Sequence, residues 1–281
     1  MKIAVIILNY NSYEDCRKCT NFLENQIGVE LEIIIIDNCS SDYKRIKEFC
    51  ETRGYIYIAS NENRGYNAGN NIGLRYAAQK GYKYALIANP DMEFPQPDYI
   101  LTLISTMERD DKIVVAGSDI IGPDNIHQNP LNFVSFWSEF LWPFDMVRNK
   151  LLKKSISSVM DHSTSKYCPM LSGCCFAIKI DFLKQQNFFD ENVFLYCEEP
   201  ILAYQVKKAG LKLYYVADCI AIHRHIKSTK GNPYKRTMIL CDSRNYKNKY
   251  YSDYNPLQLA ALYTSHKIRK CIMKILSLYS K

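Results

Sequence analysis

The first 117 residues alternate between short apolar runs and stretches of helical character. The runs are rich in β-branched and aromatic residues and are apolar without a break, as strands covered on both faces are. The runs lie at Lys2–Leu8, Leu31–Asp37, Tyr55–Ala59, Tyr82–Ala88 and Lys112–Gly117. Helix-capping residues follow the first two runs, at Ser12 and at Ser40-Ser41-Asp42. The order βαβαβαβαβ predicts an α/β fold with a Rossmann-like, mostly parallel central sheet and helices on both faces.

The second half of the chain breaks this rhythm and then recovers it. Residues 118–168 lack a clear period and predict an irregular insertion over the functional edge of the sheet. Regular elements are expected again as a strand at Met170–Lys179, a helix at Pro200–Ala209, strands at Lys212–Val216 and Cys219–Ile222, and helices around 235–251 and 257–279. The chain should therefore end in a helical tail.

Composition excludes several classes of protein. Of the 281 residues, 47% are hydrophobic and 23% are charged, which suits a globular core and not a disordered chain. The aliphatic runs are too short to cross a bilayer as a helix, and no signal peptide follows Met1, so we expect a cytoplasmic protein. The eleven cysteines are scattered singly, and the Cys16 to Cys19 pair lies in a helical stretch, which predicts packing and not metal binding or redox chemistry.

The positive charge is concentrated at the end of the chain. The formal net charge is +7, yet residues 203–281 hold 16 Lys and Arg against 3 Asp and Glu. Between Leu257 and Leu278, apolar residues mix with Lys267, Arg269, Lys270 and Lys274, as in helices that lie on anionic membranes. A contact in a homodimer and an ordinary core helix are the alternatives, and we expect no nucleic acid partner.

Polar residues stand where the first, second and fourth strands end. They are Asn9-Tyr10-Asn11, Asp37-Asn38 and Asn89-Pro90-Asp91. Ligands of open α/β sheets bind beyond the carboxyl ends of the strands, so these residues are binding candidates. Asp37 is expected to accept a hydrogen bond from a ligand, with capping of the next helix as the alternative. The first strand is not followed by Gly-x-Gly-x-x-Gly, which disfavours a nicotinamide enzyme.

Two further features offer metal ligands or a close approach to backbone. Asp91 is a hard oxygen ligand for Mg²⁺ or Mn²⁺, and His223 at a strand end could join it; a turn and an ordinary buried histidine are the alternatives. The segment Asn63–Asn71 supplies glycines and amides that let a ligand come near the main chain, or that simply start a helix.

Glu198 and Glu199 form an acidic pair before Pro200. If Pro200 is a first helical residue, Glu199 lies at or near the N-cap in an extended conformation, with its carboxylate aimed away from the helix. Such a carboxylate could act as a base, or could merely complement the helix dipole.

The order of these motifs resembles the inverting family 2 glycosyltransferases, and most of all their bacterial rhamnosyltransferase-like branch. The resemblance covers roughly residues 3–250. The motifs that carry it are Ile6–Asn11, Ile36–Asp42, Asn63-x-Gly-Tyr-x-x-Gly-Asn-Asn71, Asn89-Pro90-Asp91, Leu171-Ser172-Gly173, Phe194–Glu199 and His223.

The resemblance implies a GT-A fold, a UDP- or dTDP-sugar donor and a divalent metal, Mg²⁺ or Mn²⁺. Asp37 would recognise the pyrimidine base, and Asp91 and His223 would hold the metal, with Asn89 in place of the first acid of Asp-x-Asp. Glu199 would be the base, with Glu198 as the other choice. The remaining donor-binding residues that the resemblance implies are Leu8, Asn9, Tyr10, Asn11, Asn38, Gly65, Asn67, Gly69, Asn70 and, in the tail, Arg244.

The resulting hypothesis is an inverting glycosyltransferase of bacterial cell-surface polysaccharide synthesis, acting on a saccharide or a lipid-linked saccharide. Residues 1–222 would be the GT-A domain, with a nucleotide-binding half over 1–117 and an acceptor half over 118–222, and 223–281 a basic helical extension. The rivals are a sugar-phosphate nucleotidyltransferase, which would want a Gly- and Lys/Arg-rich first loop, and a nucleotide-sugar-binding protein without turnover.

Overall fold

One mixed β-sheet organises the part of the chain that the structure describes. The computed structural model describes residues 1–123, 125–144, 160–224 and 233–279. Within these residues the sheet has nine strands in the order β3-β2-β1-β4-β8-β6-β9-β5, with β7 paired to β9. The strands are β1 (Lys2–Asn9), β2 (Glu30–Asp37), β3 (Ile56–Ala59), β4 (Tyr84–Ala88), β5 (Met92–Glu93), β6 (Ile113–Ile121), β7 (Lys166–Cys168), β8 (Cys175–Lys179) and β9 (Lys212–His223).

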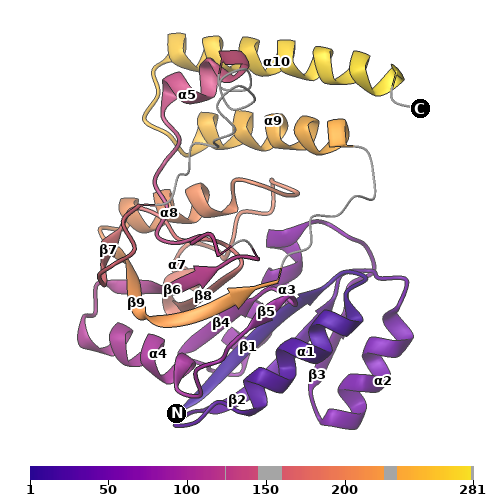
Figure 1. Ribbon diagram of the computed structural model, residues 1–281, viewed down its shortest axis with the longest axis vertical. Helices are drawn as coiled ribbons and strands as arrows, with labels where there is room; N and C mark the ends of the chain where they lie inside the picture. The colour runs from indigo at the N-terminus through magenta and orange to yellow at the C-terminus, as the bar shows by residue number, and fades with distance from the viewer. Residues whose placement is uncertain (124, 145–159, 225–232, 280–281) are drawn as a thin grey trace.

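Helices cover both faces of this sheet and continue beyond one end of it (Figure 1). They are α1 (Tyr13–Glu24), α2 (Tyr43–Arg53), α3 (Tyr66–Gln79), α4 (Tyr99–Arg109), α5 (Phe136–Phe140), α7 (Ile180–Gln185), α8 (Glu198–Lys208), α9 (Pro233–Tyr250) and α10 (Pro256–Tyr279). The predicted α/β fold with a helical tail is confirmed.

The sheet is mostly parallel, as the sequence predicts. Strand β1 pairs in parallel with β2 and β4, β2 with β3, and β6 with β9. The antiparallel strand β8 lies between β4 and β6, so the fifth run of the sequence is not the neighbour of the fourth. The expected strand at Met170–Lys179 is shorter, because the ladder begins only at Cys175, and the two expected strands after Lys212 are one continuous strand.

Alternate residues of each central strand enter different cores. Val5 and Ile7 pack with α1, α2 and α4 on one face, and Ala4 and Ile6 pack with α3, α7 and α8 on the other. This two-sided burial is the reason that the strands are continuously apolar in sequence. The Cys16 and Cys19 side chains are buried in the first core as free thiols, which confirms their packing role.

The C-terminal helices pack against part of the insertion between β6 and β7. Helices α9 and α10 lie side by side, and α10 also contacts α5 (Figure 1). Trp142, just after α5, donates from Nε1 to Ser265 Oγ at 3.1 Å, and the guanidinium of Arg269 lies 4.8 Å from the centre of its ring. The described part of the insertion therefore anchors the tail; residues 145–159 lie outside the described part. No described helix is both long and apolar enough to span a bilayer.

Candidate active site

The loops after β1 and β2 form one hydrogen-bonded cluster. Asn9 Nδ2 donates to Asp37 Oδ1 at 3.0 Å and to Ser40 Oγ at 3.1 Å, and the Ser40 N–H donates to Asp37 Oδ2 at 3.3 Å. The carboxylate of Asp37 is thereby satisfied within the protein, and the residue is 2% exposed. Asn11 accepts from the Ser41 N–H at 2.8 Å. Asp37 therefore orders the two loops as well as being a candidate for ligand contact.

The predicted capping residues do stand at the starts of α1 and α2, but their side chains do not form the expected capping hydrogen bonds. Ser12 and Asp42 are the N-caps of α1 and α2, yet neither side chain bonds its own helix. Asp42 Oδ2 instead accepts the N–H of Tyr13, the first residue of α1, at 3.3 Å. The second loop thus caps the helix that follows the first strand.

The third loop joins this edge through Asn38. Its Nδ2 donates to Asn63 Oδ1 at 3.0 Å and to the Gly65 carbonyl at 3.3 Å. The buried Oδ1 atoms of Asn38 and of Asn70 have no hydrogen-bond partner among the described residues, so each keeps an acceptor for water or ligand. Tyr10, at the tip of the first loop, is 51% exposed.

Two glycines of the Asn63–Asn71 segment permit contacts within the protein. Gly65 has a φ of +96°, and a Cβ there would lie 2.0 Å from the Phe194 carbonyl oxygen. A Cβ on Gly69 would lie 2.4 Å from Leu8 Cδ1, so α3 packs directly on β1. The sequence predicts that a ligand comes near the main chain at these glycines; in the structure, Phe194 and Leu8 of β1 take the space beside Gly65 and Gly69 instead.

Pairing of β5 with β9 brings Asp91 and His223 together. Met92 is the register partner of His223, and Asp91 Oδ1 lies 3.2 Å from His223 Nε2. His223 Nδ1 lies 2.9 Å from Gln128 Oε1, which suits a proton on Nδ1 and leaves Nε2 as the nitrogen on the side of Asp91. Burial lowers the pKa of His223, but hydrogen bonds to Asp91 and Cys174 outweigh it, and the pKa rises to about 10.

Once His223 gives up its Nε2 proton, this pair offers an oxygen and a nitrogen that fit a divalent cation. An oxygen and a nitrogen about 3 Å apart match two neighbouring ligands of an octahedral ion with bonds of about 2.1 Å. In the part of the chain that the structure describes, no group of three or more His, Cys, Asp or Glu is placed to hold a metal. A metal bound at Asp91 and His223 would therefore need most of its ligands from water or from a substrate's phosphates.

A pocket of about 430 Å³ lies beside this pair and contains several of the sequence candidates. Its wall includes Asn89, Glu198, Glu199, His223 and Arg244. Further lining residues are Tyr66, Glu139, Ser172, Gly173, Cys174, Leu195 and Lys247. The structure thus gathers around one cavity residues from the loop after β4 and from β9, α8 and α9, which are far apart in sequence.

The carboxylate pair starts α8 instead of preceding it. Glu198 is the first helical residue, so the prediction that Pro200 is the first and Glu199 an extended N-cap is wrong. The physical reason is the turn before the helix: Cys197 is left-handed with a φ of +67°, and the Tyr196 N–H donates to Glu198 Oε1 at 2.7 Å. Pro200 is tolerated in the first turn because its missing N–H would have no partner there.

The two carboxylates differ in their surroundings. Gly173 donates its N–H to Glu199 Oε1 at 3.2 Å, so the Leu171-Ser172-Gly173 motif holds this carboxylate. Burial and the neighbouring charge of Glu199 raise the pKa of Glu198 above its ordinary value, which favours its protonated form.

A buried charged cluster lies behind the cations of the pocket wall. The Glu139 side chain is 1% exposed and lies 3.6 Å from Lys247 Nζ and 3.3 Å from His266 Nε2. Asn248 Nδ2 donates to Glu139 Oε1 at 2.5 Å. Burial alone would raise the pKa of Glu139, but His266, Lys247, Arg244 and Asn248 lower it to about 2.

Some of these residues carried no usable signal in the sequence. Glu139 and Gln128 stand in the segment with no clear period, and their partners are far away in sequence. Lys247 could have been found, because it lies one helical turn after Arg244 and shares its face of α9. Tyr66 lies inside the Asn63–Asn71 motif, but only the fold shows its contact with Gly173.

The open α/β sheet, with His223 and the carboxylate pair lining one pocket, has the fold of the GT-A glycosyltransferases. The sequence model of glycosyl transferase family 2 matches residues 4–185, and the chain belongs to this family.

Individual relatives agree with this assignment. The low-salt glycan biosynthesis hexosyltransferase Agl10 of Haloferax volcanii is 26% identical over 225 residues, which cover 79% of this chain and 66% of Agl10, just under two thirds of it. The rhamnosyltransferase WbbL of Escherichia coli is 25% identical over 229 residues, covering 79% of this chain and 83% of WbbL. The mannosyltransferase PcManGT of Pyrobaculum calidifontis, solved with GDP-Man and Mn²⁺, superposes with a TM-score of 0.61 at 15% identity, over 99% of this chain and 75% of PcManGT.

Replacement of Glu139 by Gln is expected to destabilise the protein in a pH-dependent way. A pKa lowered from 4.5 to about 2 corresponds to about 3 kcal/mol of stabilisation when the group is ionised. The variant should have a lower free energy of unfolding than wild type. This deficit should be largest above pH 4.5 and should decrease as the pH falls toward 2. Urea unfolding from pH 7 downward measures it, with Glu14→Gln in an exposed ion pair as the control. A difference that did not change with pH would contradict an ionised Glu139.

Proposed function

We propose that the protein transfers a sugar from a UDP- or dTDP-sugar to a hydroxyl of a saccharide or lipid-linked saccharide, with inversion at the anomeric carbon, in bacterial cell-surface polysaccharide synthesis. The observation that carries this proposal is the pocket that holds the Glu198-Glu199 pair together with His223, which is paired to Asp91. The bound GDP-Man of PcManGT and the rhamnosyl transfer named for WbbL support a nucleotide-sugar donor and this branch of the family.

The donor would lie along the carboxyl edge of the parallel strands. Asp37 and its neighbours Leu8 to Asn11 and Asn38 would receive the nucleoside, where the cluster of Asn9, Asp37 and Ser40 provides a preordered polar surface. Asn89 and the pair of Asp91 and His223 would lie near the diphosphate. Gly65, Gly69 and Asn70 border this edge at the start of α3, whereas Asn67 is buried and donates to the Asp190 carbonyl.

The chemistry follows from the charges around the pocket. The acceptor oxygen attacks the anomeric carbon, the bond from that carbon to the diphosphate oxygen breaks, and the acceptor proton passes to Glu199. We assign the base to Glu199 because the Gly173 N–H holds its carboxylate in place, whereas burial and the charge of Glu199 favour the protonated form of Glu198. When bound at Asp91 and His223, Mg²⁺ or Mn²⁺ would neutralise charge on the departing diphosphate. Arg244 and Lys247 add positive charge to the same cavity.

Metal removal is expected to abolish turnover. With only two candidate ligands from the described protein, EDTA or Asp91→Asn should lower the rate of nucleoside diphosphate release at least a hundredfold, and excess Mn²⁺ should restore the EDTA-treated wild type. A panel of UDP- and dTDP-sugars is the assay. Undiminished release in EDTA would refute the metal. Formation of UTP or dTTP together with sugar 1-phosphate, when pyrophosphate is added to the same sugars, would indicate a nucleotidyltransferase.

Replacement of Glu199 by Gln is expected to remove the base and to spare the donor site. Transfer should fall by about a hundred- to ten-thousandfold, while the Kd for UDP or dTDP changes by less than about threefold. Glu198→Gln is the matched control and should cost much less, because the raised pKa of Glu198 favours the neutral form that Gln imitates. A larger loss in Glu198→Gln would assign the base to Glu198.

The exposed face of α10 fits an anionic membrane surface, which we propose as a peripheral contact on the inner face of the membrane. Ile268, Ile272 and Ile275 are 53%, 39% and 55% exposed and lie at helical spacing on one side of the helix. Lys267 and Lys274 lie on the same helix and would meet anionic headgroups, whereas Lys270 pairs with Asp242 of α9 at 2.5 Å.

Vesicles that contain anionic lipid are expected to sediment the protein at low salt and to release it at high salt. Neutral vesicles and the double variant Ile268→Asp, Ile275→Asp should give little sedimentation. Failure to sediment with anionic vesicles would contradict the membrane contact, and loss of a dimer in the double variant on size-exclusion chromatography would assign this face to a homodimer instead.

A further inference from the structure

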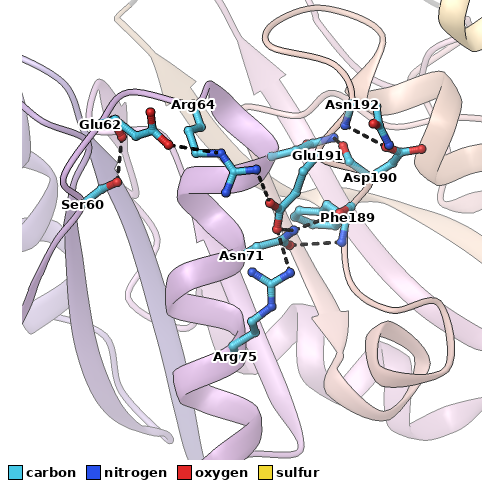
Figure 2. A network of polar contacts seen from close by, with 10 residues as sticks. Ser60, Glu62, Arg64, Asn71, Arg75, Phe189, Asp190, Glu191 and Asn192 are labelled. Atoms are coloured by element: carbon cyan, nitrogen blue, oxygen red, sulfur yellow. Dashed lines mark hydrogen bonds and ion pairs between the residues drawn. The ribbon is translucent and has the colours of Figure 1, made fainter.

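The segment Phe189–Cys197 leads directly into the carboxylate pair, and α3 holds it from one side. Asn71 forms two hydrogen bonds with the main chain of Phe189: Nδ2 donates to the carbonyl at 2.8 Å and Oδ1 accepts the N–H at 3.0 Å. Asn71 Nδ2 also lies 2.8 Å from Glu191 Oε1, and Arg75 and Arg64 pair with the same carboxylate at 2.7 and 3.2 Å (Figure 2). The start of the segment is thus fixed to α3.

Two more residues of α3 continue this attachment toward the carboxylates. Asn67 Nδ2 donates to the Asp190 carbonyl at 2.7 Å, and the Tyr66 N–H donates to the Phe194 carbonyl at 3.0 Å. The Tyr66 hydroxyl donates a short hydrogen bond to the Gly173 carbonyl, and the N–H of Gly173 donates to Glu199. Tyr66 therefore contacts both segments that position Glu199, the one that contains Phe194 and the one that contains Gly173.

Helix α9 holds the same segment from the other side. The hydroxyls of Tyr246 and Tyr251 donate to Asp190 Oδ2 at 2.8 and 2.5 Å, and Ser243 Oγ donates to the Leu195 carbonyl at 2.7 Å. The segment is fixed along its length before it turns, through two left-handed residues, into Glu198.

We propose that the first two turns of α3, through Tyr66, Asn67 and Asn71, are a positioning element for Glu198 and Glu199 and control the rate of transfer more than the affinity for donor. The inference rests on the proposed function for the role of the carboxylates. The side-chain amide of Asn71 is hydrogen-bonded to the main chain of Phe189, and Nδ2 of Asn67 donates to the Asp190 carbonyl. Asn71 and Asn67 are 0% and 3% exposed, so a nucleotide has little access to either side chain. Their partners all lie in the segment that ends at the carboxylate pair.

Asn71→Asp tests this with almost no change in shape. The substitution replaces the donating Nδ2 by an oxygen that faces the Phe189 carbonyl and the Glu191 carboxylate. Gln26→Glu is the matched control away from the pocket, because Gln26 Nε2 donates to the Gln96 carbonyl at 2.8 Å and Oε1 accepts the Ile100 N–H at 3.1 Å. Both variants place a carboxylate oxygen against a carbonyl in a buried two-bond bridge.

Both variants are expected to lose similar stability, but only Asn71→Asp should lose activity. We expect its kcat to fall tenfold to a hundredfold, since small displacements of a catalytic group are costly, while the Kd for UDP or dTDP stays within threefold of wild type. Tyr66→Phe keeps the ring and removes only the hydrogen bond to Gly173. It should likewise lower kcat and leave the Kd unchanged, and it replaces Asn71→Asp in the test if that variant does not fold.

A second readout does not depend on turnover. Hydrogen exchange of the amides of Phe194 to Glu199 should quicken in Asn71→Asp and stay unchanged in Gln26→Glu. Equal kcat values in Asn71→Asp and Gln26→Glu, a Kd that weakens in parallel with kcat, or unchanged exchange would overturn the inference. A wild-type protein with no transfer, but with the expected exchange pattern, would count against the proposed function and not against the positioning role.

Discussion

Burial of the central strands on both faces decides where polar chemistry can occur. Alternate residues of β1 and β2 enter two separate apolar cores, so a polar side chain within either strand would need a partner that neither core supplies. Asn9 and Asp37 therefore stand at the final residues of their strands, opposite each other in register, and satisfy one another there. The loops, the cap of α1 by Asp42 and the attachment of α3 all build on this edge.

The antiparallel additions to the sheet complete the pocket. Strand β5 is only two residues long, but its pairing with the end of β9 places Asp91 against a histidine 132 positions later. Strand β8 runs back between β4 and β6, and its approach brings Gly173 to Glu199. The parallel half provides a polar edge, and the antiparallel strands supply the groups that close around it.

The parallel half of the fold could be predicted because its information is local. Continuous apolar runs, capping residues and helical stretches each fall within a dozen residues, and the motif order pointed to the pair of Asp91 and His223. The start of α8 could not be predicted, because it depends on a left-handed Cys197 and on Glu198 accepting the Tyr196 N–H, whereas Pro200 alone suggests a later start. Glu139 and Gln128 were missed because their partners are set by tertiary packing across about a hundred residues. The glycines of the Asn63–Asn71 segment predict close approach of a ligand, whereas the atoms that approach Gly65 and Gly69 belong to Phe194 and Leu8, which only tertiary packing brings there.

The contacts of Asp190 and Leu195 with Ser243, Tyr246 and Tyr251 mean that the pocket is assembled from segments that are synthesised at different times. During synthesis the segment that carries Glu198 leaves the ribosome well before Ser243, Tyr246 and Tyr251 do. Until those residues emerge, the segment can be held by α3 alone, and Arg244 and Lys247 are missing from the pocket wall. All the described strands precede α9 in the chain, so the wall that α9 contributes is the last part of the pocket to be synthesised.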